Sequence, residues 1–191
     1  MSLFPGVAEI TAPFTRLTNS AQPAQAPVAE AATLVTGSTI EIPPGGLKVG
    51  AEYEVEMNVT KTAAGTATSS IALGFVPYGE AVSAANVDNL IVLTKPAGTA
   101  AIDTAVFRAK VKVLAIGIAE AGSVVAELVV LRGLPATGHV GAGAGVVYSA
   151  DTTVATVTTI DVTGGGTMAC VLTTGASDAI TINSVKASLT Q

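Results

Sequence analysis

Several residue types are scarce in this chain, and their scarcity excludes whole classes of protein. Tryptophan is absent, aromatic residues make up 4% of the sequence, and there is one cysteine and one histidine. A single cysteine, Cys170, can form neither an internal disulfide nor a cysteine-rich metal site. It lies in the strand-like run 167–173, which predicts a small buried apolar side chain rather than a reactive thiol. Without tryptophan, a sugar-binding site has little on which to stack its ligand.

Charge is also scarce. Charged residues are 12% of the chain and the net charge is −5, with an isoelectric point near 4.7. A nucleic-acid binder normally carries a clustered basic surface and a high isoelectric point, so we expect no DNA or RNA partner. The mean hydropathy is +0.60, but Glu120 and Glu127 interrupt the best apolar stretch before it reaches the roughly 18 residues of a membrane span. The N-terminus has no basic region followed by an apolar one, so no signal peptide is predicted.

What the chain has in quantity is small apolar residues. Hydrophobic residues are 49% of the 191, and much of that share is alanine and valine. A chain of this length suits one domain. Small side chains bury little area each, and burial contributes roughly 25 cal/mol per Å². A core of this kind gains from further burial against a partner, so we expect an oligomer or an attached subunit.

The longest strand unit spans residues 101–132. Its first half, 102–114, alternates apolar with charged residues, as a half-buried strand does. Its second half, 123–132, is apolar on both faces apart from Glu127. A glycine-bearing connection between the halves predicts a long hairpin at the centre of a sheet. The outward charges of the first half are Arg108, Lys110 and Lys112.

A second strand, predicted over residues 51–60, carries the opposite charge. Its outward face is a row of acidic residues: Glu52, Glu54 and Glu56. If this strand neighbours 102–114, or meets it across a subunit contact, the two rows form a charge ladder. Exposed ion pairs are worth about 0–1 kcal/mol each, so the ladder would set register and choice of partner more than stability. The alternative is two separate solvated faces.

The remaining segments repeat the strand pattern. A short helical turn is predicted around residues 83–87, and a phase slip near Asn183 and Ser184 predicts a bulge or a crossing between sheets. Roughly ten short strands separated by turn residues indicate an all-β fold, an antiparallel β-sandwich or jelly roll over residues 31–191. The further strands are expected at 40–42, 69–76, 90–94, 145–149, 153–163 (after a break at Asp151), 167–174 and 179–190.

Residues 1–30 differ from the rest and read as an extended arm followed by a linker. Prolines at four positions exclude helix and central strand alike. Two of the chain's four phenylalanines lie in this segment, which is unusual for a purely solvated tail. It is therefore either a disordered tail or an arm that docks onto another subunit. The candidate docking residues are Leu3, Phe4, Ile10, Phe14 and Arg16.

No catalytic, cofactor-binding or metal-binding residue is predicted, and we do not expect an enzyme. His139 has no Gly-x-Ser-x-Gly motif to serve, and the glycine-rich loop 138–145 lacks the lysine of a phosphate-binding loop. A surface calcium between the loops of Asp151 and Asp178 is conceivable from their carboxylates alone. Solvated turn aspartates are the simpler interpretation.

The run from Leu34 through Ile-Glu-Ile-Pro-Pro-Gly-Gly to Thr-Lys-Thr-Ala-Ala-Gly65 resembles the opening of jelly-roll-like domains in virion proteins of tailed bacteriophages. The Thr/Gly-rich C-terminal strands are similar in style, so the resemblance covers about residues 31–191. Such domains occur on head decoration proteins and on minor tail or fibre proteins. The resemblance implies a structural role without an active site.

For a chain of one domain and an arm, the resemblance favours a decoration protein on the outer surface of the head. The implied partners are the major capsid protein and further copies of the chain, commonly as a homotrimer. The implied location is the virion, assembled in the bacterial cytoplasm. The alternatives are a tail or fibre domain that contacts a host receptor, and a carbohydrate-binding sandwich or enzyme outside viruses.

Overall fold

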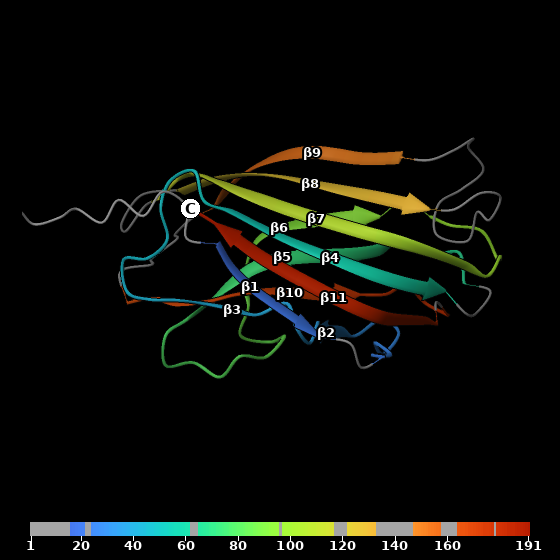
Figure 1. Cartoon of the computed structure of the whole chain (residues 1–191). Coiled ribbons are helices and arrows are strands. Elements are labelled where there is room, and N and C mark those ends of the chain that lie inside the picture. Colours follow the sequence, from blue (N-terminus) through green and yellow to red (C-terminus); the bar gives the residue numbers. More distant parts are fainter. Residues whose placement is uncertain are drawn as a thin grey trace, which may run out of the picture.

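The computed structural model describes residues 16–21, 24–61, 65–95, 97–116, 122–132, 147–157, 164–177 and 179–191. Across these ranges the chain forms eleven strands and no helix, arranged as two antiparallel sheets packed face to face (Figure 1). The predicted all-β sandwich is confirmed. The strands are β1 (Arg16–Ala21), β2 (Ala32–Leu34), β3 (Ile40–Ile42), β4 (Glu52–Lys61), β5 (Ser69–Pro77), β6 (Asp88–Lys95), β7 (Asp103–Ala115), β8 (Gly122–Arg132), β9 (Val147–Val157), β10 (Gly166–Thr173) and β11 (Ile180–Thr190).

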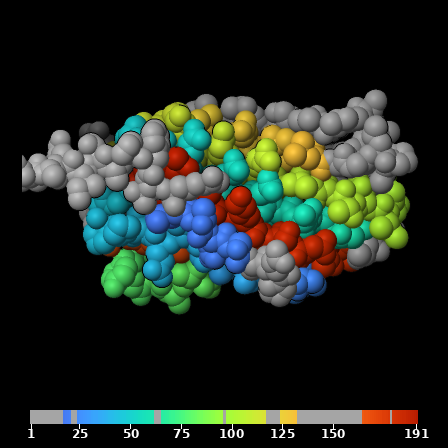
Figure 2. All heavy atoms as spheres, viewed as in Figure 1, coloured from blue at the N-terminus to red at the C-terminus, as the bar shows by residue number. Residues whose placement is uncertain are grey.

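The larger sheet has six strands in the order β1-β11-β4-β7-β8-β9, and the smaller has five, β2-β10-β5-β6 with β3 also paired to β10. The hairpin of β7 and β8 lies in the middle of the larger sheet, between β4 and β9, as its length and alternation predicted. This sheet presents one broad outer face to solvent (Figure 2). Its inner face packs on the smaller sheet.

The core lies between the two sheets and is built by strict alternation. In β4 every second side chain from Tyr53 to Val59 is buried, while the glutamates between them stay partly exposed. The same alternation in β7 buries Phe107 among valines and alanines. Tyr53, Phe75 and Phe107 are the aromatic members of a core that otherwise consists of aliphatic and sulfur-containing side chains. Since each buried aliphatic group adds to the transfer free energy, many small contributions hold the sheets together.

A β-bulge in β11 resolves the phase slip of the C-terminal strand. The pairing of β11 with β4 shifts between Ile182 and Ser184, so Asn183 is the extra residue. The shift returns Val185, and the alternate residues after it, to the core face that Ile180 and Ile182 already occupy. Of the two alternatives raised by the sequence, the bulge is therefore correct, and β11 stays in one sheet throughout.

Two local predictions are wrong. Residues 83–87 form turns, with the Asn86 amide donating to the Ser83 carbonyl at 3.1 Å, and not a helical turn. One such bond closes a single turn. The Asn86 side chain also donates from Nδ2 to the Ala81 carbonyl, and together these bonds stabilise a turn and not a helix. The predicted break at Asp151 does not end the strand: β9 runs through it as one strand, and Asp151 and Thr152 form a bulge opposite Glu127 where the pairing with β8 shifts register.

The chain enters the sandwich earlier than its proline content suggested. β1 lies within the expected arm and linker, pairs with β11 along the edge of the larger sheet, and packs Leu17 against the core. Farther on, Gln25 and Ile182 exchange two backbone hydrogen bonds of 2.8 Å. The Gln25 side chain also accepts from the Thr36 amide and donates to the Thr36 carbonyl. Both ends of this segment are thus tied to the domain.

Candidate interaction surface

The two charged rows predicted from the sequence lie side by side on the outer face of the larger sheet. β4 and β7 pair antiparallel, with Glu52 opposite Lys112, Glu54 opposite Lys110 and Glu56 opposite Arg108. The strands are therefore neighbours within one chain, the first of the arrangements considered above. We call these six residues, together with Glu127 of β8, the charge ladder.

Arg108 makes the shortest ion pair of the ladder. Its Nη2 donates to Glu56 Oε2 at 2.7 Å, and its Nε donates to the same oxygen at 3.2 Å. Glu54 Oε1 lies 3.9 Å from the same Nε. The hydrogen bond to Glu56 raises the pKa of the Arg108 guanidinium above its already high usual value.

The two lysines pair with different neighbouring strands. Lys112 Nζ lies 3.2 Å from Oε1 of Glu52, its opposite residue on β4, whereas Lys110 Nζ lies 3.2 Å from Oε1 of Glu127, its opposite residue on β8. The hydrogen bond to Glu127 raises the pKa of Lys110. Glu127 was absent from the predicted site, although it is the one charge on an otherwise apolar stretch of 123–131 and lies directly opposite Lys110.

The ladder has four acidic and three basic residues and is partly exposed. Its paired side chains are 32–44% exposed, so each pair is worth well under about 1 kcal/mol to the fold. Lys186 of β11 lies opposite Glu56 on its other side and extends the pattern toward β1. The surface can therefore present alternating charges in fixed positions to a protein partner, an arrangement that sets orientation and specificity more than affinity.

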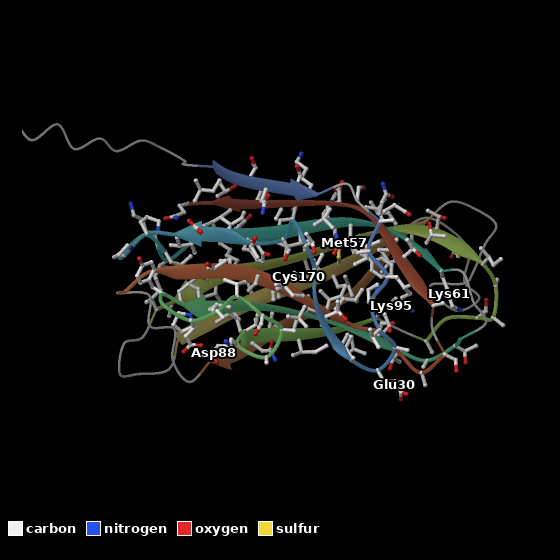
Figure 3. All side chains as sticks on the ribbon, turned by 90° about the horizontal axis from the view of Figure 1, so that it is seen from below. Glu30, Met57, Lys61, Asp88, Lys95 and Cys170 are labelled. Atoms are coloured by element: carbon white, nitrogen blue, oxygen red, sulfur yellow. The ribbon has the colours of Figure 1, made fainter. Side chains whose placement is uncertain are left out.

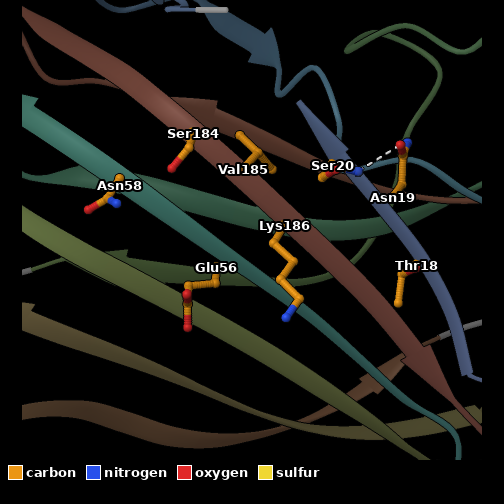
Figure 4. A pocket seen from close by; sticks show the side chains of 8 residues that line it. All are labelled: Thr18, Asn19, Ser20, Glu56, Asn58, Ser184, Val185 and Lys186. Carbon is orange, nitrogen blue, oxygen red and sulfur yellow. Dashed lines mark hydrogen bonds between the residues drawn. The ribbon is translucent and has the colours of Figure 1, made fainter. Parts of the chain in front are cut away.

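A shallow polar pocket of about 510 Å³ adjoins the ladder where β1, β11 and β4 meet (Figure 4). Glu56, Asn58 and Lys186 line it, together with Ser20 and other short polar residues of β1 and β11. Its donors and acceptors are of the kind that bind polar groups of another protein. In the ranges given above no three His, Cys, Asp or Glu side chains gather to hold a metal.

Three charged residues are buried at one end of the sandwich, which the sequence did not predict. Lys61 and Lys95 are 2% exposed and Asp103 is 4% exposed; the two lysines lie toward the same end of the domain (Figure 3). Asp103 lies directly opposite Lys61 in the pairing of β4 with β7. Lys61 Nζ donates to the carbonyls of Gly65 and Thr99, which lie in the β4–β5 and β6–β7 connections between the two sheets. These hydrogen bonds stabilise this end of the sandwich.

The remaining candidates contribute no site. Cys170 is fully buried, as predicted, and burial raises the pKa of its thiol to about 12. Arg16 begins β1 opposite Thr190. Asp151 lies within β9. The predicted candidates that lie outside the described residues are Leu3, Phe4, Ile10, Phe14, the loop 138–145 with His139, and Asp178.

No protein-family model matches the chain, and no curated protein matches it in sequence. Among the residues with assigned structure there is no helix long and apolar enough to cross a membrane.

Proposed function

We propose that this chain is a structural protein of a tailed-bacteriophage virion, a decoration protein that binds the outer surface of the head. The resemblance of residues 34–65 to phage jelly-roll-like domains suggests the class. It is compatible with the all-β sandwich, whose β3, β4 and intervening Pro-Pro-Gly-Gly turn come from that segment.

The observation that carries the proposal is the charge ladder. A flat outer face with alternating, mutually paired charges is suited to docking on another folded protein. It is poorly suited to a small substrate, which needs a concave and largely apolar site. The ladder and its neighbouring polar pocket share Glu56 and so form one continuous polar surface.

The arm supplies the second contact. Residues 1–15 precede an edge strand of the same sheet that carries the ladder, so arm and ladder can engage neighbouring subunits together. Two weak contacts on one chain raise the effective affinity, and repeated copies on a head raise it further. We expect the major capsid protein and other copies of the chain, as a trimer, to be the partners.

The test is to add purified protein to heads of the encoding phage assembled without it, and to image them by cryo-electron microscopy. The proposal predicts regularly spaced density on the outer head surface at saturating protein. Bare heads would contradict it. Density at the tail or its fibres would support the receptor-binding alternative instead.

A further inference from the structure

A second depression, of about 610 Å³, lies where β1, the end of β3, the β5–β6 connection and the start of β10 meet. Its walls are the end of β3 with the turn that follows, and the connection from β5 to β6; these segments lie side by side in Figure 2. Leu17 of β1 forms part of its rim. We call it the proline groove, because Pro43, Pro44 and Pro77 line it.

The proline groove is apolar in its walls and acidic at its margins. Tyr78 and Val82, which line it, are 82% and 41% exposed, an unusual exposure for such side chains. Glu41 and Glu80 also line it and bring negative charge. Grooves built from proline and an exposed aromatic ring bind extended, proline-containing segments, whose restricted backbone loses little entropy on ordering.

A segment with these properties leads directly into the groove's rim. Residues 12–16 read Ala-Pro-Phe-Thr-Arg and are followed by Leu17. Pro13 holds its surroundings extended. Phe14 is a large apolar side chain, and Arg16 is the only basic residue before Lys48, so the segment complements the groove in both shape and charge.

We propose that residues 12–14 of the same chain seat in the proline groove, with the Phe14 ring against Tyr78. At about 3.4 Å per extended residue, the three-residue tether lets Phe14 be at most about 10 Å from Leu17, which gives a high effective concentration at the groove. A second copy has no such advantage. The seat anchors the base of the arm and leaves Leu3, Phe4 and Ile10 to reach a neighbour. This contact lies within one free chain, so its test does not depend on the proposed function.

The experiment follows tryptic cleavage after Arg16 by mass spectrometry in Phe14→Ala, Tyr78→Ala and the double variant. Losing part of a buried aromatic contact should raise the cleavage rate about fivefold in each single variant. Since both variants remove the same contact, the double variant should be cleaved no faster than either single one. Tyr78 is mostly exposed, so unfolding of Tyr78→Ala is not expected to confuse the result.

Phe4→Ala is the matched control, with the same substitution ten residues farther along the arm; it should change the rate less than about twofold. Unchanged cleavage in the single variants, or fivefold effects that multiply in the double variant, would contradict the proposed contact of Phe14 with Tyr78. A cleavage rate that depends on protein concentration would overturn the same-chain assignment and indicate the groove of another copy.

Discussion

Glu56 and Arg108 lie directly opposite each other on neighbouring strands, and a hydrogen bond of 2.7 Å joins their side chains on the outer face of the larger sheet. This pair begins a row of alternating charges that runs across β4, β7 and β8. Because the row is half-exposed, its contribution to folding is small and its pattern is available to a partner. Stability and binding can therefore be separated by mutation.

Reversing the basic row tests that separation. Arg108→Glu, Lys110→Glu and Lys112→Glu together place like charges opposite Glu56, Glu54 and Glu52, which should lower the free energy of unfolding by about 1–3 kcal/mol at low salt. Urea denaturation in 20 mM and 500 mM salt measures this, and high salt should restore part of the loss. Equal stability in both salts would contradict the ladder's intramolecular pairing.

A full exchange of the ladder's charges is the control for binding. Replacing its four glutamates by lysine in the reversed variant restores every internal pair but inverts the pattern that a partner meets. We expect stability within about 1 kcal/mol of the original chain and loss of binding to heads. Retained binding by this stable, inverted surface would show that the ladder does not contact the head.

Tyr53 ties the larger sheet to the segment between β2 and β3 through the core. Its hydroxyl donates to the Ser38 carbonyl at 2.5 Å, and both residues are buried. Tyr53→Phe leaves that carbonyl without its donor and should cost about 1–2 kcal/mol in urea denaturation. Tyr78→Phe removes the same atom from an exposed ring and should cost nothing measurable; equal effects would argue against the buried bond.

Lys61 closes one end of the sandwich. Lys61→Met removes the donor to the Gly65 and Thr99 carbonyls and leaves Asp103 buried opposite an apolar side chain. We expect a loss of about 2–3 kcal/mol, because two carbonyls lose their charged donor. Lys48→Met, at an exposed turn, is the control and should stay within about 0.5 kcal/mol. A neutral Lys61→Met would mean that water replaces the ammonium there.

Cys170 makes stability fall at alkaline pH. Burial raises the pKa of its thiol from 9.0 to about 12, so the folded chain keeps a proton that the unfolded chain has lost. This stabilisation is complete below pH 9 and declines as the pH rises toward 12, by about 1.4 kcal/mol per pH unit. Urea denaturation between pH 9 and 10 should show that slope, and Cys170→Ala should lack it. The same slope in both proteins would refute the assignment.

Two deletions separate the arm from the edge strand. Removing residues 1–15 leaves β1 intact and should change the melting temperature by only a few degrees. Removing residues 1–30 takes away β1, the packing of Leu17 and the Gln25 hydrogen bonds, and should lower it by about 10 °C. Equal melting temperatures would show that β1 adds nothing to the domain.

The sequence predicted those features that depend on alternation along one strand. The glutamates of β4, the basic residues of β7 and the bulge at Asn183 all follow from a period of two, which places each side chain on a face. Strand pairing adds what no single strand contains. That Lys110 reaches Glu127 depends on β8 lying beside β7 in a particular register, although the Glu127 charge was visible beforehand.

The failures have tertiary causes. Lys61 and Lys95 look like solvated strand ends, and only the crossing connections bury them. Proline-flanked residues 16–21 look like a linker, and only the open edge of β11 makes them a strand. Asp151 looks like a turn residue, yet it forms only a bulge, because pairing with β8 resumes on both sides of it. In each case a partner distant in sequence outweighs local preference.

The most direct test of the account is cosedimentation of the chain with heads lacking it, comparing the intact protein, the residue 1–15 deletion and the charge-exchanged ladder. We predict that the intact protein saturates at a fixed number of copies per head. We also predict that both variants, although folded, stay in the supernatant. Saturation by both variants at the intact protein's level would contradict the claim that this sandwich acts through its ladder and its arm.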